Sequence, residues 1–307
     1  MWNPRKPKKQ LAFVLSGGGS RGAMQAGALR ALLEAGYQPD LITGTSIGAA
    51  NGAFLAVHGF TPQGIQKLEK MWAATVDQDL LPTNLWWQTM RTFFKRPVGF
   101  SQDRIREFAI AAGLAPNLRF QDLTGIRFFP VAADLNSGRP VVFGTRPEEC
   151  VLDSVLASMS LPPWLAPRQE DGRYLMDGGA VSNLPIQAAL EQGATEIIAL
   201  DLFDPDEVSD DNAGLKGFLL KLDKTVEGRQ AELEIELAKA RGVPVRHITL
   251  VGEKPVPLWD FRSSIELIER GYQLAQQAAA EWPPAPHPRW QKLRLKTFLS
   301  DLLDALD

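Results

Sequence analysis

Residues 10–57 contain the pattern that most restricts how this chain can fold. An apolar run from Gln10 to Leu15 ends in a glycine-rich stretch, and a second run at 41–43 ends in a serine between glycines. The segments that follow, 23–35 and 47–57, have the composition of helices. This order favours neighbouring parallel strands joined by a right-handed crossover. Both loops then emerge at the carboxyl edge of one sheet, where open α/β sheets place their functional sites.

The rest of the chain continues the alternation of strands and helices. Asn136-Ser137-Gly138 lies between two strand-like runs and indicates a hairpin. Four prolines between residues 283 and 288 mark a linker before a final amphipathic helix. The expected strands are 126–134, 140–145, 174–176, 196–202 and 245–251, and the expected helices lie within 62–115 and at 148–160, 185–192, 215–241 and 263–281.

Composition and charge exclude several classes of protein. The net charge is -3, so the chain lacks the overall basic field of a nucleic-acid-binding protein. The single cysteine, Cys150, cannot form an internal disulfide, which suits a reducing compartment. The apolar run after the basic start is too short for a signal peptide, and no run approaches membrane-spanning length. We therefore expect a cytoplasmic protein that meets a membrane only peripherally.

The second loop matches a nucleophile motif. Gly44-Thr45-Ser46-Ile47-Gly48 fits the G-x-S-x-G turn that presents a serine between a strand and a helix. The strand before it and the helix after it are the context that this motif requires. Small residues follow the turn, so the helix can pack close to the sheet. Ser46 is therefore the expected nucleophile, with Gly44 and Gly48 forming the elbow.

The first loop, residues 16–22, has two interpretations. Consecutive glycines at a helix N-terminus expose backbone N–H groups, which can bind an anion. A nucleotide phosphate is one such anion, but the Lys-Ser/Thr ending of a P-loop is missing and the dinucleotide spacing is only loosely met. The other interpretation is an oxyanion hole, which needs donors beside the nucleophile. The expected parallel strands put this loop next to Ser46.

A serine needs a base to take its proton, and the chain offers few candidates. Of its three histidines, His58 lies about 18 Å along the helix from Ser46 and His287 lies in the proline linker. His247 allows the order Ser, Asp, His of an α/β-hydrolase triad, although it lies inside a strand. Asp177 is the alternative, because a desolvated carboxylate within hydrogen-bond reach of the hydroxyl can act as a base. Gly178 and Gly179 beside it permit that close approach.

Taken together, these motifs resemble the patatin-like phospholipase family. Gly17-Gly18-Gly19-Ser20-Arg21-Gly22 is similar to its oxyanion loop, Gly44–Gly48 to its nucleophile elbow, and Asp177-Gly178-Gly179 to its Asp-Gly-Gly/Ala motif. Ala157-Ser158-Met159-Ser160-Leu161-Pro162 looks like its Ala-Ser-x-x-x-Pro stretch. The order of the motifs agrees, and the match covers about residues 10–205.

The resemblance implies a three-layer α/β/α fold with a mainly parallel central sheet. It also implies a Ser46–Asp177 dyad that hydrolyses a phospholipid or another acyl-lipid ester without a histidine, a metal or a cofactor. The oxyanion-hole segment would comprise Gly17, Gly18, Gly19, Arg21 and Gly22. Arg21 would orient the loop or hold a lipid phosphate. Residues 10–205 would form the catalytic domain, and residues 206–307 a helical extension that packs on it and ends in an amphipathic helix.

Three other functions share parts of this pattern. An α/β-hydrolase esterase would use His247, an inactive relative would bind lipid without cleaving it, and an acyltransferase would share only the first half-reaction. Two amphipathic segments are candidates for a membrane or core contact. In residues 84–96 the side chains of Trp86, Trp87, Met90, Phe93 and Phe94 fall on one helical face, and the C-terminal helix carries a similar stripe that would also suit dimerisation.

Overall fold

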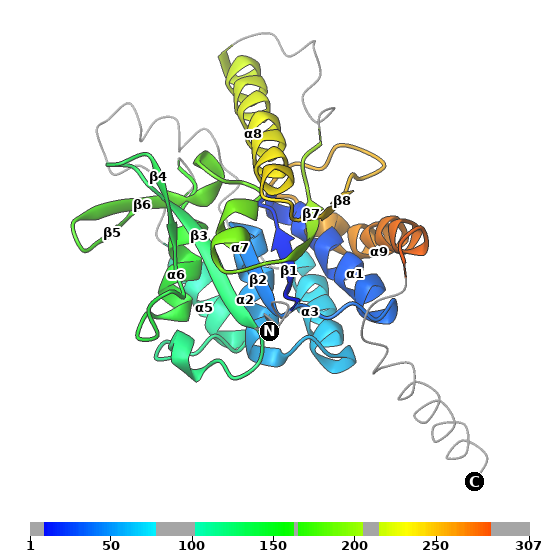
Figure 1. Ribbon diagram of the computed structural model, residues 1–307. Coiled ribbons are helices and arrows are strands. Elements are labelled where there is room, and N and C mark those ends of the chain that lie inside the picture. The colour runs from blue at the N-terminus through cyan, green and yellow to red at the C-terminus, as the bar shows by residue number, and fades with distance from the viewer. Residues whose placement is uncertain (1–8, 78–101, 163–164, 205–214, 284–307) are drawn as a thin grey trace, which may run out of the picture.

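The computed structural model describes residues 9–77, 102–162, 165–204 and 215–283. Its centre is an eight-stranded sheet in the order β5-β6-β3-β2-β1-β7-β8, with β4 paired to β3 (Figure 1). The strands are β1 Leu11–Leu15, β2 Leu41–Thr45, β3 Arg127–Asp134, β4 Arg139–Val142, β5 Arg168–Glu170, β6 Arg173–Asp177, β7 Glu196–Asp201 and β8 Val245–Thr249. Strands β3, β2, β1, β7 and β8 are parallel, whereas β4, β5 and β6 pair antiparallel.

Helices cover both faces of this sheet. They are α1 Gly22–Glu34, α2 Ile47–His58, α3 Pro62–Ala74, α5 Asp103–Ala111, α6 Val151–Ser158, α7 Ile186–Glu191, α8 Leu215–Ala240 and α9 Ser264–Ala280. Alternate residues of β1 enter two separate cores. Phe13 and Leu15 pack with α1, α2 and α3, while Ala12 and Val14 pack with α7 and α8. The expected three-layer α/β/α fold with a mainly parallel sheet is confirmed.

The N-terminal unit that the sequence predicted is present. β1 pairs with β2 in parallel, from Ala12 beside Leu41 to Leu15 beside Gly44, so both strands end at the same edge of the sheet. The glycine loop and the serine turn therefore leave that edge as neighbours. Both faces of these strands are buried, as is usual for parallel strands covered by helices.

Two predicted elements are shorter than expected for one local reason. The strand expected at 140–145 ends at Val142, and the helix expected from 148 begins at Val151. Between them the Glu149 carboxylate accepts a hydrogen bond from the Gly144 amide at 2.7 Å, and Gly144 has a φ of 82°. A left-handed glycine and this side-chain bond form a turn that continues neither element. The hairpin between β3 and β4 is antiparallel, as predicted.

The later part of the chain adds to the same sheet. β8 pairs with β7 in register, with His247 beside Ala199. α9 packs closely against α1 because each helix has a glycine at the contact. A Cβ at Gly27 would collide with the Ile268 carbonyl, and one at Gly271 would collide with the Met24 backbone. The division of the chain at residue 205 stays a prediction. Residues 84–96 and the expected C-terminal helix lie outside the described residues. Within the described residues, no helix combines the length and apolarity needed to cross a membrane.

Candidate active site

Ser46 lies in a strained turn between β2 and α2. Its φ of 54° and ψ of -121° are unusual for a residue with a side chain. Such backbone strain concentrates at functional sites. The flanking glycines make the turn sterically feasible. A Cβ at Gly48 would collide with the Leu15 carbonyl, and one at Gly44 would lie 2.6 Å from the carbonyl carbon of Gly48.

The Ser158 hydroxyl, at the end of α6, links the Ser46 turn to strand β3. It accepts a hydrogen bond from the Ser46 amide at 2.9 Å and donates one to the Val131 carbonyl of β3 at 2.6 Å. Ser158 is fully buried. In the sequence, Ser158 stood out only as part of the Ala157–Pro162 stretch, and its neighbours did not indicate that it supports the nucleophile.

The glycine loop passes directly beside the nucleophile. A Cβ at Gly17 would lie 3.2 Å from Ser46 Cβ and would collide with Asn183 Oδ1. The Gly17 amide donates to the Asn183 carbonyl at 3.1 Å, so it is already occupied. Among the described residues, the amides of Gly18 and Gly19 have no hydrogen-bond acceptor. These two N–H groups are therefore available to an oxyanion, whereas that of Gly17 is not.

Arg21 and Gly22 support the loop from inside the protein. Arg21 is 3% exposed, and its Nε donates to the Gly18 carbonyl at 3.2 Å. Of the two roles considered for Arg21, this contact supports orientation of the loop. A Cβ at Gly22 would lie 2.5 Å from Ile47 Cγ1, so a glycine lets α1 begin against the nucleophile turn.

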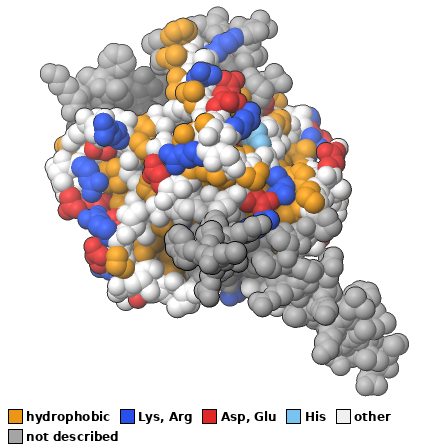
Figure 2. Space-filling view, viewed as in Figure 1, with side chains coloured by type: hydrophobic (Ala, Val, Ile, Leu, Met, Phe, Trp, Pro, Cys, Tyr) orange, Lys and Arg blue, Asp and Glu red, His pale blue; other side chains and the backbone are white. Residues whose placement is uncertain are grey.

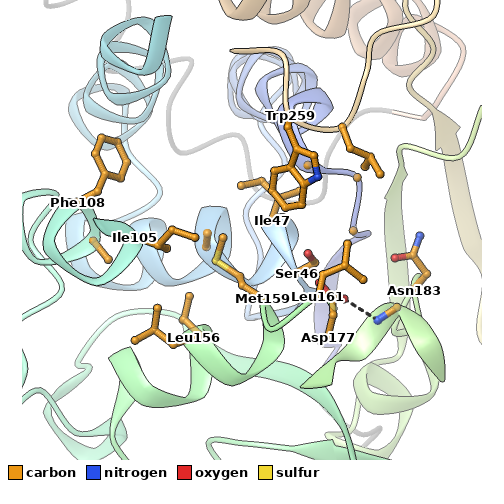
Figure 3. A pocket seen from close by; sticks show the side chains of 18 of the residues that line it. Ser46, Ile47, Ile105, Phe108, Leu156, Met159, Leu161, Asp177, Asn183 and Trp259 are labelled. Atoms are coloured by element: carbon orange, nitrogen blue, oxygen red, sulfur yellow. Dashed lines mark hydrogen bonds between the residues drawn. The ribbon is translucent and has the colours of Figure 1, made fainter. Parts of the chain in front are cut away.

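Asp177 ends β6 and its carboxyl lies beside Ser46 (Figure 3). β6 pairs antiparallel with β3, which places Asp177 opposite Ala132, with β3 as the one strand between β6 and β2. The Gly179 amide donates to Asp177 Oδ1 at 2.9 Å, whereas Oδ2 has no hydrogen-bond partner among the described residues. Gly178 is required here, since a Cβ would collide with the Val131 carbonyl. Ser46 and Asp177, which are 131 residues apart in the sequence, thus meet at one edge of the sheet.

Burial changes the acidity of this carboxyl. Desolvation raises the pKa of Asp177 from 3.8 to about 7, while the Ser46 hydroxyl and the Gly179 amide act in the opposite direction. The carboxylates of Asp223 and Glu227 on α8 add a smaller rise. A carboxyl with a pKa near 7 can both accept and return a proton at neutral pH.

The loop that follows Asp177 is held by α8. The Glu234 carboxylate, which is buried, accepts hydrogen bonds from the Ser182 hydroxyl and the Gln187 amide. The Gln230 side chain donates to the Ala180 carbonyl at 3.0 Å and accepts from the Asn183 amide at 3.3 Å. These contacts could not be predicted from the sequence, because Gln230 and Glu234 lie more than forty residues beyond the groups that they bond.

The two histidines that the structure describes, His58 and His247, lie away from Ser46. His247, on β8, is three strands from β2, or roughly 14 Å at the usual strand spacing. Its Nε2 lies 2.9 Å from Asp201 Oδ2, and it does not line the cavity at Ser46. His58 Nε2 lies 2.9 Å from the Ala112 carbonyl at the far end of α2. His287 is outside the described residues.

A cavity of about 330 Å³ opens at the serine. The glycine loop, Ser46, Asp177 and Asn183 form its polar end together with the Asp223 and Glu227 carboxylates of α8, which act on Asp177. Apolar side chains of α2, α3, α5, α6 and the loop at 258–261 line the remainder (Figure 3). Polar groups converging at one end of an apolar cavity are typical of a site for an amphiphilic ligand. Across the described ranges, no group of three or more His, Cys, Asp or Glu side chains could hold a metal ion.

Comparison with known proteins identifies the family. A sequence model of the patatin-like phospholipases matches residues 13–190, which is more than half of the chain. The chain belongs to the patatin-like phospholipase family. The resemblance inferred from the motifs is therefore confirmed, and the matched residues include the glycine loop, the elbow and Asp177.

Several patatin-like relatives are much longer than this chain. Patatin-like phospholipase domain-containing protein 7 of Rattus norvegicus is 34% identical over 206 residues, which cover 66% of this chain and 14% of the relative. Patatin-like phospholipase domain-containing protein 6 of Homo sapiens is 32% identical over 200 residues, covering 64% and 14%. Lysophospholipase NTE1 of Yarrowia lipolytica is 27% identical over 213 residues, covering 66% and 13%. The chain thus spans a small fraction of the relatives that it matches.

Solved structures give a weaker likeness. Human GIVD cytosolic phospholipase A2 aligns with a TM-score of 0.47 at 14% identity, covering 89% of this chain and 59% of that one. VipD from Legionella pneumophila aligns with a TM-score of 0.44 at 14% identity, covering 89% and 67%. Both scores lie below 0.5, so no conclusion about this chain rests on them.

Proposed function

We propose that this protein is a serine acyl hydrolase that cleaves the ester bond of a phospholipid or another acyl lipid. Ser46 acts as the nucleophile and Asp177 as its base. The observation that carries the proposal is the buried Asp177 carboxyl, which has a pKa of about 7 and lies beside a serine in a strained turn. A structural aspartate at a turn needs neither feature.

The first half-reaction forms an acyl-enzyme. Ser46 Oγ attacks the ester carbonyl carbon while Asp177 accepts the hydroxyl proton, and the carbonyl oxygen becomes an oxyanion. The amides of Gly18 and Gly19 donate to that oxyanion. When the tetrahedral intermediate collapses, the ester C–O bond breaks and Asp177 returns its proton to the leaving alkoxide. The alcohol departs and the acyl group remains on Ser46.

The second half-reaction releases the acid. Asp177, ionised again, takes a proton from a water molecule that attacks the acyl carbonyl. The Gly18 and Gly19 amides stabilise the second oxyanion in the same way. Collapse breaks the bond to Ser46 Oγ, which regains the proton from Asp177. The ester and one water molecule thus give one alcohol and one acid, and Ser46 and Asp177 return to their starting states.

The cavity and the family support a lipid substrate. Its lining is apolar except at the catalytic end, which suits an acyl chain that delivers its carbonyl to Ser46. The family is that of phospholipases, and one relative is named a lysophospholipase. Arg21 contributes through the glycine loop, since its Nε bonds the Gly18 carbonyl.

A fluorophosphonate probe tests the nucleophile. Such a probe transfers its phosphonyl group to an activated serine hydroxyl, so peptide mapping of the labelled protein should find the adduct on Ser46. The Ser46→Ala variant should lose both labelling and ester hydrolysis while keeping its melting temperature. Ser137→Ala, in the turn between β3 and β4, is the control and should behave as the wild type. Labelling at another serine with unchanged turnover would refute the proposal.

Product analysis separates hydrolysis from its rivals. Incubation with a phospholipid should release free fatty acid in proportion to the lyso-lipid formed. Transfer of the acyl group to a second lipid, without free acid, would make the protein an acyltransferase. Binding of the phospholipid with neither product and without labelling would make it an inactive lipid-binding protein.

A further inference from the structure

The cavity extends from the catalytic end along one face of α2. Ile47, Ala50 and Phe54 line it, and their spacing of three and four residues puts them on the same side of the helix. α5 and α6 form the opposite wall. Figure 3 shows Ser46 and Asp177 at one end, Phe108 at the other, and Leu156 and Met159 between them. The cavity is therefore elongated, with the nucleophile at one end.

Helix geometry gives the depth of this cavity. Phe54 is eight residues beyond Ser46, which corresponds to about 12 Å along the helix axis. A fully extended peptide covers about 3.5 Å in the three backbone bonds of one residue. At a similar length per bond, about ten bonds of an extended alkyl chain span the 12 Å from Ser46 to Phe54. Ala50, four residues beyond Ser46, stands about 6 Å along the same path, near the fifth bond.

The carboxyl end of α5 lies at the far end of the cavity, one helical turn beyond Phe108. The Ala112 carbonyl lies 2.9 Å from His58 Nε2, which ties this end of α5 to the last turn of α2. Ala112 lines the cavity together with Phe54 and Leu114, which are 4% and 3% exposed. Phe54 and Leu114 thus belong to the packed core, whereas Ala112 is half-buried, and its methyl group is the smallest of the three side chains.

We propose that α2 is a gauge for acyl-chain length, in which Ala112 sets a limit of about ten carbons and Ala50 keeps the path open. The ligand is an unbranched saturated acyl chain whose carbonyl lies at Ser46. This assignment rests on the proposed function and adds its chain-length preference. Among the described residues, no residue of α2 beyond Phe54 lines the cavity, so carbons beyond the tenth gain little from this wall.

The test compares p-nitrophenyl esters of butyric, octanoic, decanoic and palmitic acid. Each buried methylene contributes about 0.8 kcal/mol, or about fourfold in kcat/KM. For the wild type, kcat/KM should rise from butyrate to decanoate and level off before palmitate. Ala112→Phe should lower the ratio of decanoate to butyrate by about tenfold or more, and Ala112→Leu by less. Ala50→Leu should lower the ratio of octanoate to butyrate as well, because the obstruction lies closer to Ser46.

Ala111→Phe is the matched control, since Ala111 is the last residue of α5, directly precedes Ala112, is exposed and does not line the cavity. Its ratios should equal those of the wild type. If Ala112→Phe unfolds, the graded effect of Ala112→Leu decides. Decanoate-to-butyrate ratios that stay at the wild-type value in folded Ala112 variants would overturn the gauge, although Ser46 still cleaved every ester. Absence of any hydrolysis or labelling by the wild type would instead refute the proposed function.

Discussion

The Ser158 hydroxyl joins the nucleophile turn to the central sheet, accepting from the Ser46 amide at 2.9 Å and donating to the Val131 carbonyl at 2.6 Å. A turn held in a strained conformation needs such support, because relaxation would move the Ser46 hydroxyl away from Asp177. Ser158 is therefore a positioning residue for the proposed reaction.

Ser158→Ala should lower kcat by about 10- to 100-fold with little change in KM, because a displaced nucleophile reacts slowly with substrate that still binds. It should also reduce the free energy of unfolding by about 1–3 kcal/mol, since the Ser46 amide loses its partner. Ser154→Ala is the matched control on the same helix. Ser154 is equally buried, but its hydroxyl bonds only the Val151 carbonyl of its own helix. Equal losses of kcat in both variants would contradict the positioning role.

The rate should depend on pH through Asp177. The base must be ionised, and burial raises its pKa to about 7. Below about pH 7, kcat/KM for a soluble ester should therefore rise about tenfold for each pH unit and then level off, as expected for a single essential base in the free enzyme. A profile that is flat between about pH 5 and 8 would show that no group with this pKa limits the reaction.

The same carboxyl should make the wild type less stable at high pH. The folded protein holds the Asp177 proton up to about pH 7, whereas the unfolded chain releases it near 3.8, so stability falls as the pH rises between these values. Asp177→Asn is neutral throughout. Above about pH 7 it should be more stable than the wild type by up to roughly 4 kcal/mol, and near pH 4 the difference should be small.

Asp153 offers a contrast for that measurement. Burial tends to raise the pKa of Asp153, but hydrogen bonds from Arg106 and Cys150 and the charge of Arg168 hold it below its usual value. Asp153→Asn should therefore destabilise the protein at neutral pH, with an effect that fades as the pH falls through the folded pKa. Urea unfolding of both variants at two pH values checks the opposite signs. Equal pH dependence in both would contradict the account of Asp177.

The glycine loop should tolerate no side chain at Gly19. Its φ is 58°, and a Cβ would collide with the Leu258 carbonyl. Gly19→Ala should therefore displace a proposed oxyanion donor and lower kcat by about 10²- to 10³-fold, with a smaller rise in KM. Gly138→Ala is the control, because Gly138 has a similar φ of 66° and open space around it. If both variants keep wild-type kcat, the Gly19 amide is not a donor to the transition state.

Much of this site could be predicted from sequence because its motifs are local. A strand that ends in glycines and a G-x-S-x-G turn are readable in a few residues, and the parallel pairing of β1 and β2 brings the two loops together. The identity of the base was not readable in this way. Asp177-Gly178-Gly179 has the composition of an ordinary turn, and only the antiparallel pairing of β6 with β3 brings it beside β2.

The supporting contacts were also beyond the sequence, since each depends on tertiary packing. Ser158 reaches the Ser46 amide from another helix, and Glu234 reaches the loop after Asp177 from α8. The cavity is lined by side chains of α2, α5 and α6, which come together only in the folded chain. Figure 2 shows charged side chains of both signs among apolar ones on the face that it presents, which agrees with the small net charge.

The central claim is that Asp177, and not a histidine, activates Ser46. The most direct test measures hydrolysis of one soluble ester near neutral pH by Asp177→Asn and by His247→Ala, each shown to be folded. The account predicts that Asp177→Asn loses activity by orders of magnitude, whereas His247→Ala, which breaks only the contact with Asp201, keeps most of it. An active Asp177→Asn protein together with an inactive, folded His247→Ala protein would contradict the account and favour a histidine-dependent esterase.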